Sequence, residues 1–177
     1  MLGMAAQKNS NIILKNMEKV KYYWLCSYRL EVGSIVKPGN WGRIIKMYTP
    51  QNNNHHAFIA AREYVFELVR RENFSDKPSR LESTFLCKTM EDAQELHQKN
   101  RQFDLIYEVE LVNNDQIFET DMALVDSDPA DTILAIEAKA KIYWNPSAIV
   151  KPEILTSSPI KIIGFFEIGV EIIQNNE

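Results

Sequence analysis

Helix-like and strand-like patterns occupy different parts of this chain, and their order constrains the fold more than any single motif. Between Ala57 and Glu72, apolar residues recur at helical spacing with charged residues on the opposite face. A second helix is predicted to begin after Thr89, which serves as its N-cap, and to end near Asn100. Most strand-like segments follow these helices. This segregation favours an α+β fold with antiparallel sheets over a doubly wound parallel one.

The strand predictions rest on segments rich in β-branched and aromatic residues, which are separated by turn-forming residues. The first strand is predicted over Tyr22–Val32 and is closed by Gly33. Leu105–Val112 and Gln116–Val125 flank an Asn-Asn-Asp turn and are predicted to pair as a hairpin. The other predicted strands are Leu81–Cys87, Ile133–Trp144 and Pro159–Ile168.

The length of 177 residues suits one domain with a hydrophobic core. We expect residues 1–21 to form an N-terminal lead-in and residues 22–177 a single domain, because no repeat or linker divides the chain. No apolar run approaches the roughly 18 residues of a membrane span, and no signal-type stretch begins the sequence. Cys26 and Cys87 stand outside any Cys-x-x-Cys pair, which indicates two buried thiols in a reducing compartment and a cytoplasmic location.

Composition also limits the classes of ligand. The 20 Lys and Arg residues against 24 Asp and Glu give a formal net charge of -4, so no overall basic field indicates a nucleic-acid-binding protein. The 6 glycines form neither Gly-x-Gly-x-x-Gly nor Gly-x-x-x-x-Gly-Lys, which excludes a Rossmann turn and a P-loop. His55 and His56 lack a matching carboxylate spacing, so no metal site is predicted.

Two early segments place polar side chains in strand-like surroundings. Arg29 follows Tyr28 in an aromatic stretch, where its guanidinium needs a bound anion or, as an edge-strand residue, solvent or a salt bridge. Ser83, Thr84 and Phe85 follow a proline-containing loop and offer hydroxyls and an aromatic face. The alternative is an ordinary strand start whose hydroxyls satisfy turn carbonyls.

A third segment lies late in the chain. Tyr143 and Trp144 precede a proline-rich loop that leads to Glu153. We expect the Glu153 carboxylate to be held at a strand entrance and partly desolvated, as catalytic carboxylates often are. The alternative is a carboxylate that caps a strand or takes part in a salt bridge.

In chain order, these three segments make the sequence resemble the ADP-ribosyltransferase superfamily over residues 22–166. The string Pro-Gly-Asn-Trp-Gly-Arg at residues 38–43, with Pro-Ser-Arg-Leu at 78–81 and Phe85 ahead of a Glu-Asp-Ala helix, resembles an uncharacterised, mainly bacterial group that we place within that superfamily. The resemblance implies a split, mostly antiparallel sheet with flanking helices. It also implies that NAD, as a substrate, lies in the cleft between the two halves.

The resemblance carries site roles residue by residue. Arg29 matches the arginine that holds NAD through its phosphate or ribose, and Glu153 matches the catalytic glutamate. Ser83 and Thr84 match the start of a Ser-Thr-Ser element that shapes the nicotinamide pocket, although Phe85 replaces its third residue. The aromatic residues that are candidates to stack on nicotinamide are Tyr28, Phe85 and Tyr143.

The implied activity is that of an NAD-dependent mono-ADP-ribosyltransferase, a toxin or phage-defence effector that modifies nucleic acid or protein and is restrained by an antitoxin or inhibitor protein. Two alternatives stay open: a catalytically silent NAD-binding module on the same fold, and an NAD-dependent RNA 2-phosphotransferase-like enzyme.

Two sequence features bear on the acceptor. Arginine-modifying members carry Glu or Gln two residues before the catalytic glutamate, whereas this chain has Lys151, which speaks against arginine as the acceptor. A local basic rim is expected to favour RNA or DNA over protein, and its members are Lys37, Arg43, Arg80 and Lys151.

Overall fold

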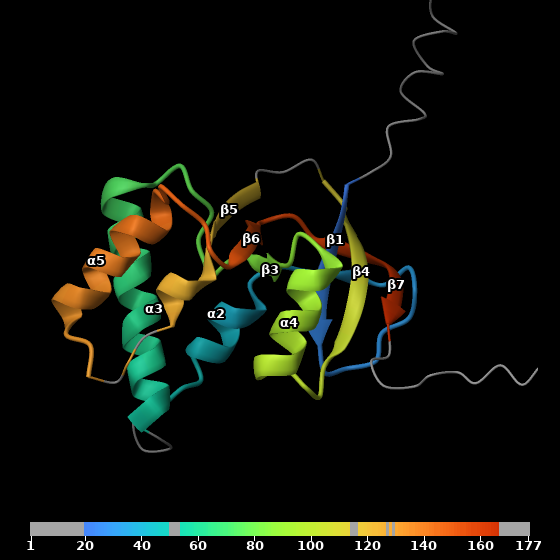
Figure 1. Ribbon diagram of the computed structural model, residues 1–177, viewed down its shortest axis with the longest axis horizontal. Coiled ribbons are helices and arrows are strands. Elements are labelled where there is room, and N and C mark those ends of the chain that lie inside the picture. The colour runs from blue at the N-terminus through green and yellow to red at the C-terminus, as the bar shows by residue number, and fades with distance from the viewer. Residues whose placement is uncertain (1–19, 50–53, 114–116, 127, 129, 167–177) are drawn as a thin grey trace, which may run out of the picture.

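The computed structural model describes residues 20–49, 54–113, 117–126, 128 and 130–166 (Figure 1). The predicted lead-in therefore lies outside the described residues, except for its last two positions. The elements, in chain order, are β1 (Lys21–Cys26), β2 (Ile35–Val36), α2 (Asn40–Ile45), α3 (Asn54–Asn73), β3 (Thr84–Leu86), α4 (Met90–Asn100), β4 (Leu105–Leu111), β5 (Ile117–Asp121), the 3-10 helix η2 (Met122–Val125), α5 (Ile133–Trp144), β6 (Pro152–Thr156) and β7 (Ile160–Phe166).

Two antiparallel sheets form the centre of the molecule. The first sheet has the strand order β1-β4-β7-β2, and the second has the order β3-β6-β5. In Figure 1 the second sheet lies between the first sheet and the pair of helices α3 and α5. The predicted α+β class with antiparallel sheets is thus confirmed.

The second sheet is covered on both faces. Its Leu86 and Ile154 pack against the first sheet in one hydrophobic cluster, whose other buried members are Tyr22, Tyr107, Val109, Ile160 and Ile162. On the opposite face, Leu155 joins α3 and α5 in a second cluster, together with Phe66, Val69, Val125, Ile136, Ala140, Tyr143 and Trp144. Buried apolar area on both faces makes this sheet a rigid platform for the side chains that it carries.

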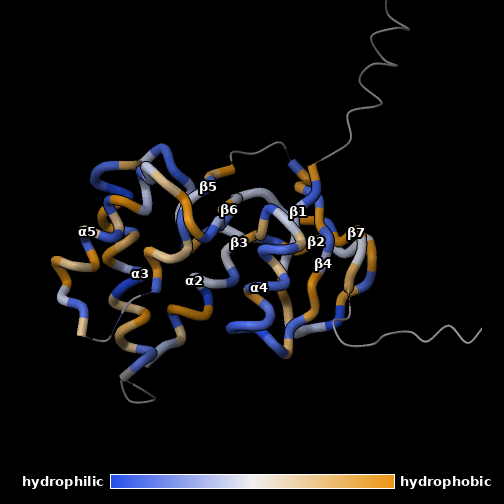
Figure 2. The backbone as a smooth tube through the Cα atoms, viewed as in Figure 1, coloured by the Kyte–Doolittle hydropathy of each residue, from blue (hydrophilic) through white to orange (hydrophobic). Residues whose placement is uncertain are grey.

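Both predicted early helices are confirmed, α3 and α4. The Thr89 hydroxyl accepts a hydrogen bond from the Asp92 amide at 3.1 Å, and the Asp92 carboxylate accepts one from the Thr89 amide at 3.2 Å. Thr89 is thus the N-cap of α4, as predicted, and Asp92 completes a capping box. Figure 2 shows α4 as a largely hydrophilic helix, and only Ala93 and His97 in it are buried. No helix in the described part of the chain is long and apolar enough to span a bilayer.

The prediction of a strand over Ile133–Trp144 is wrong, because these residues form α5. The Thr132 hydroxyl accepts a hydrogen bond from the Ala135 amide at 3.2 Å and caps the helix. Ile136, Ala140 and Tyr143 are buried, a spacing of four and three residues that places them on one helical face. Alanine, the best helix former, occurs three times in the segment and outweighs the apparent alternation.

The predicted hairpin between Leu105–Val112 and Gln116–Val125 is also wrong. Both segments contain strands, but β4 pairs with β1 and β7, whereas β5 pairs with β6 in the other sheet. Both edges of β4 are therefore occupied. Phe118 of β5 instead stacks against Trp144 of α5, with ring centroids 5.7 Å apart, so packing on α5 draws β5 into the second sheet.

The first strand ends earlier than predicted, at Cys26 rather than Val32. Its partner β4 begins at Leu105, which lies opposite Cys26, so the ladder has no further partner residue. Residues 27–34 form a loop that contains Tyr28 and Arg29. The final predicted strand is confirmed as β7 over Ile160–Phe166, and the last two residues of that prediction lie outside the described part.

Candidate active site

A tight turn at residues 79–83 connects α3 to β3. The Ser79 carbonyl accepts hydrogen bonds from the Glu82 amide at 3.1 Å and from the Ser83 hydroxyl at 2.6 Å. This turn uses residues that the sequence analysis assigned to the strand Leu81–Cys87, so β3 begins only at Thr84. The Ser83 hydroxyl satisfies a turn carbonyl, which was the alternative interpretation of this residue.

Glu67 of α3 fixes this turn. Its carboxylate accepts hydrogen bonds from the Ser79 hydroxyl and Arg70 Nη2, each at 2.8 Å, and from Arg71 Nε at 2.8 Å. Burial alone would raise the pKa of Glu67, but the hydrogen bonds from Arg70, Arg71 and Ser79 outweigh it and hold the pKa below its usual value. An ionised carboxylate thus anchors the residue immediately before Arg80.

The Pro-Gly-Asn-Trp-Gly-Arg string packs against the same turn. Gly39 adopts a φ of 83°, a conformation that favours glycine, and its amide donates to the Ser83 carbonyl at 3.1 Å. Gly42 lies in α2 so close to Leu81 that a Cβ atom would stand 2.1 Å from the Leu81 carbonyl oxygen. Two motifs that are about 40 residues apart in sequence are therefore in contact through their backbones.

We predict that Gly42→Ala destabilises the protein by about 1–3 kcal/mol, because the new methyl group clashes with backbone that cannot rotate away. Gly164→Ala is the matched control. Its Cβ would meet the Glu108 side chain at 3.4 Å, and that side chain can move. Urea denaturation measures both. Equal midpoints for Gly42→Ala and wild type would show that α2 does not hold the turn.

Arg80 lies at the centre of a buried polar network and is 5% exposed. Its Nε donates to Glu63 Oε2 at 2.9 Å, and its Nη1 donates to Glu153 Oε2 at 2.8 Å. The guanidinium carbon lies 4.7 Å from the ring centroid of Phe85 and 5.0 Å from that of Tyr143. One cation thus joins α3 to β6 and lies against two aromatic rings.

Glu153 is the second residue of β6, so the prediction that it lies at a strand entrance is confirmed. Its Oε2 accepts hydrogen bonds from Arg80 Nη1 at 2.8 Å and from the Tyr143 hydroxyl at 2.7 Å. Among the described residues no hydrogen bond to Oε1 is formed, and the side chain as a whole is 9% exposed. The carboxylate is thus oriented through one oxygen and keeps the other for an incoming donor.

The network has one dominant charge state at neutral pH. Burial alone would raise the pKa of Glu63, but the Arg80 and Arg62 guanidiniums outweigh it and hold the pKa below its usual value. Burial alone would lower the pKa of Arg80, but Glu63, Tyr143 and Glu153 raise it well above its usual range. Burial, with the nearby Glu153 carboxylate, raises the pKa of Tyr143 far beyond neutral pH. Tyr143 therefore stays a neutral donor to Glu153.

The loop before β6 is held by Asp121, the last residue of β5. Asp121 Oδ1 accepts from the amides of Ala123 at 2.9 Å and Lys151 at 3.0 Å, and Oδ2 accepts from the Val150 amide at 3.0 Å. Burial alone would raise the pKa of Asp121, but these amide donors hold it below its usual value. The entry of the chain into β6, and so the start of the strand that carries Glu153, is fixed by an ionised side chain.

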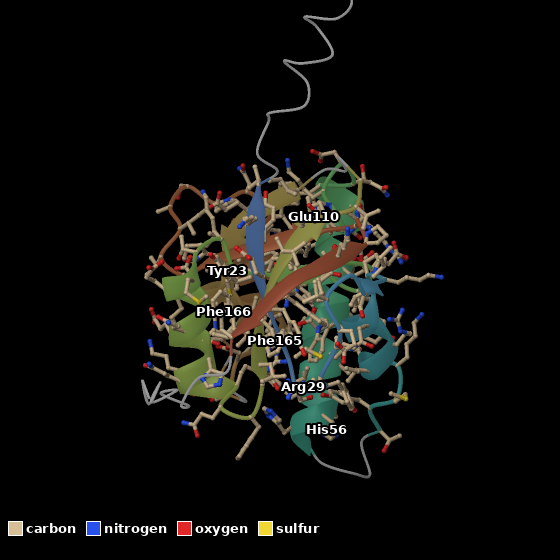
Figure 3. All side chains as sticks on the ribbon, turned by 90° about the vertical axis from the view of Figure 1, so that its right-hand side faces the viewer. Tyr23, Arg29, His56, Glu110, Phe165 and Phe166 are labelled. Carbon is tan, nitrogen blue, oxygen red and sulfur yellow. The ribbon has the colours of Figure 1, made fainter. Side chains whose placement is uncertain are left out.

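Tyr28 and Arg29 lie on the loop after β1, which contacts the first sheet. Figure 3 labels Arg29. The Arg29 guanidinium lies 5.2 Å from the ring centroid of Phe165 on β7. Tyr28 is 75% exposed. Arg29 was predicted either to bind an anion or to reach solvent or a salt bridge from an edge strand. In the structure its side chain is exposed, and it lies on a loop rather than within a strand.

The two sheets meet at one seam. Tyr23 of β1 and Cys87 exchange backbone hydrogen bonds of 3.0 and 2.8 Å, the single bridge between these segments among the described residues. Because the pair is antiparallel, the loop after Cys26 and the start of β3 at Thr84 lie at the same end of the seam. Continuing the β3–β6 register by one residue places Glu153 opposite Cys87.

The structure brings some of the predicted site residues together. Phe85, Tyr143 and Glu153 surround Arg80, and Ser83 and Thr84 adjoin them at the start of β3. Tyr28 and Arg29 belong to the loop against the other sheet. The ring of Tyr143 is fully buried and its hydroxyl is bonded to Glu153, so this residue does not present a face for nicotinamide.

The predicted basic rim is not formed as expected. Arg80 is buried between two carboxylates, and Lys151 Nζ lies 3.1 Å from Asp126 Oδ2. Lys37 and Arg43 are exposed. Charge neutralisation removes two of the four cations from the surface field that was expected to attract nucleic acid.

Sequence reasoning missed the positioning roles of Glu63, Glu67 and Arg80. The two glutamates were assigned to the polar face of a helix, and Arg80 to a surface rim. The four-residue spacing of Glu63 and Glu67 was the available signal, because it places two carboxylates on one face of α3. Both carboxylates are buried because the turn at 79–83 packs on that face of α3, which the sequence alone does not show.

Both cysteines are free thiols, as predicted, but only Cys87 is buried, whereas Cys26 is partly exposed. Burial raises the pKa of Cys87 to about 12. At neutral pH this thiol is protonated, so Cys87 is not a nucleophile even though it lies at the seam.

Comparison with known proteins gives a family. The comparison with curated proteins found no match. A family model described as "Protein of unknown function (DUF2441)" matches residues 6–175, which includes the turn, the Arg80 network and the loop that carries Arg29. This chain therefore belongs to the DUF2441 family.

Proposed function

We propose that this chain is an NAD-dependent mono-ADP-ribosyltransferase. The observation that carries the proposal is the state of Glu153, whose carboxylate accepts two hydrogen bonds at Oε2 and, among the described residues, none at Oε1. Glu153 stands at the position that the resemblance gives to the catalytic glutamate. Two antiparallel sheets, joined in the described part of the chain by the Tyr23–Cys87 bridge, are compatible with the split sheet that such an enzyme needs.

In the proposed reaction, the bond between ribose C1′ and the nicotinamide nitrogen breaks, and nicotinamide leaves with both bonding electrons. The ribose becomes oxocarbenium-like. Glu153 Oε1 accepts a hydrogen bond from the ribose 2-hydroxyl, and its charge offsets the developing positive charge. An acceptor oxygen or nitrogen then bonds to C1′, and its proton passes to Glu153 and from there to water.

The other candidate residues would hold NAD. Arg29 presents the planar charged fork that suits a diphosphate. Ser83 and Thr84 would line the nicotinamide pocket at the start of β3. Of the three aromatic candidates, Tyr28 and the partly exposed Phe85 have ring surface to offer, whereas Tyr143 acts as a donor to Glu153.

The acceptor is proposed to be nucleic acid, with Lys37 and Arg43 as the remaining exposed cations of the rim. Incubation with adenine-labelled NAD and cell lysate tests this. We expect label to enter a fraction that nuclease removes and protease does not. Label in protein bands alone would show that the acceptor is protein rather than nucleic acid, while the proposed transferase activity would be supported.

The same incubation separates the two alternatives. Saturable NAD binding without release of nicotinamide would identify a catalytically silent binding module. Transfer of an RNA 2-phosphate to ADP-ribose would identify a phosphotransferase-like enzyme. We expect neither result, because an oriented carboxylate with one open oxygen suits transfer to an incoming nucleophile.

A further inference from the structure

Tyr107 of β4 supports the loop that carries Arg29. Its side chain is fully buried, and its hydroxyl forms hydrogen bonds with two backbone groups. The hydroxyl accepts a hydrogen bond from the Leu30 amide at 2.8 Å and donates one to the Tyr28 carbonyl at 2.9 Å. These groups flank Arg29 on either side. A single side chain, rooted 77 to 79 residues away in the core, therefore fixes the backbone of the residue proposed to hold NAD.

The same tyrosine also supports the ring that lies against Arg29. Tyr107 and Phe165 are cross-strand partners with ring centroids 6.2 Å apart, and the Arg29 guanidinium lies 5.2 Å from the Phe165 centroid. Figure 3 shows Arg29 and Phe165 together at one end of the first sheet. Tyr107 thus contacts both the backbone of Arg29's loop and the aromatic ring next to its charge.

A β-bulge sets this arrangement. The register between β4 and β7 shifts between Glu108 and Val109, so that Ile163 is an extra residue on β7. Because side chains alternate along a strand, one extra residue exchanges the faces of all residues beyond it. The shift places Phe165, rather than Gly164, opposite Tyr107.

We propose that Tyr107 is a positioning residue, which holds Arg29 in the geometry that receives the diphosphate or ribose of NAD. This inference rests on the proposed function. Without the Tyr107 hydroxyl, the backbone of residues 28–30 loses these two hydrogen bonds, so more of the loop's conformational freedom is lost at the moment of binding. The penalty falls on NAD affinity, because Glu153 and its network lie on other elements.

The test compares Tyr107→Phe, which keeps the ring, with Tyr22→Phe. Tyr22 belongs to the same hydrophobic cluster, but the bonds to Tyr28 and Leu30 come from Tyr107. We expect Tyr107→Phe to raise the KM for NAD about tenfold, the equivalent of one or two hydrogen bonds, with kcat changed less than about twofold. Tyr22→Phe should leave both constants unchanged.

A double-mutant cycle shows whether Tyr107 acts through Arg29. In an Arg29→Ala background, Tyr107→Phe should raise KM no further. An unchanged KM in Tyr107→Phe, or an equal rise with and without Arg29, would overturn this inference while leaving the transferase intact. A wild-type protein that neither binds nor cleaves NAD would overturn the proposed function, and the inference with it.

Discussion

Replacing Arg80 with methionine is expected to destabilise the protein by about 3–5 kcal/mol at pH 7, a large part of the stability of an ordinary domain. The substitution keeps most of the side-chain length but removes the cation that lies between Glu63 and Glu153. Glu63 then keeps Arg62 as its remaining cation, and Glu153 keeps the hydrogen bond from the Tyr143 hydroxyl. The Tyr143 hydroxyl loses the hydrogen bond that it accepts from Arg80 Nη1. Urea denaturation monitored by tryptophan fluorescence measures the loss.

The loss should depend on pH in a defined direction. In the wild type, Glu63 has a lowered pKa, so its pairing contributes stability above the unfolded pKa, which is lost as the pH falls through the folded pKa. In Arg80→Met one of the two cations beside Glu63 is absent while Arg62 remains, so the pKa of Glu63 in the folded protein is higher than in the wild type. As the pH falls, the folded variant then takes up a proton more readily than the folded wild type. The difference in stability between the two proteins should therefore shrink between about pH 7 and pH 4.

Arg71→Met is the matched control. Arg71 also bonds a carboxylate, Glu67, through Nε at 2.8 Å, but its side chain is 70% exposed. We expect this variant to lose less than about 1 kcal/mol, because solvent screens exposed pairs. Equal losses for the two variants would contradict the account of Arg80 as the centre of a buried network.

Glu153→Gln is expected to lower kcat for NAD cleavage by about 10²–10⁴-fold, the range for loss of a general base or a charge that stabilises the transition state. The amide keeps the size of the side chain and can accept the hydrogen bond from Tyr143. It lacks the negative charge that offsets the oxocarbenium-like ribose. The KM for NAD should change much less, because the charge acts mainly in the transition state.

Glu119→Gln provides the comparison for Glu153→Gln. Glu119 lies on the neighbouring strand β5, opposite Ile154, and pairs with Lys88 at the surface, with its side chain 35% exposed. Its loss should leave kcat unchanged within about twofold. A comparable fall in kcat for both variants would point to a general electrostatic effect and not to a role for Glu153 in the reaction.

Patterns within short segments of the sequence predicted the helices and strands whose formation depends on neighbouring residues. The N-cap residue Thr89 and the helical spacing in α3 identified two helices, and the turn-bounded apolar runs identified β4 and β7. The segment that became α5 misled because alternation and helical periodicity overlap in a short, Ala-rich run. Strand pairing failed for a different reason: the turn at residues 113–115 suggests a hairpin, but partner choice depends on the packing of Phe118 against α5.

The candidate site was predicted in its residues more than in its arrangement. Glu153, Ser83 and Phe85 were identified by their positions in chain order. Phe85 and Glu153 both contact Arg80, whereas Ser83 lies before the start of β3, at the end of that strand away from Glu153. Arg80 was interpreted as a surface charge because the sequence does not show which carboxylates an arginine pairs with in the folded protein. Its two carboxylates lie 17 and 73 residues away, and only tertiary packing brings them together.

The most direct test of the central claim is release of nicotinamide from NAD by the purified wild-type protein, beside Glu153→Gln shown by urea denaturation to be folded. We predict release and covalent transfer of ADP-ribose by the wild type, and a fall of at least about 10²-fold in Glu153→Gln. Equal release by the two proteins, or none by wild type supplied with nucleic acid and protein acceptors, would contradict the account.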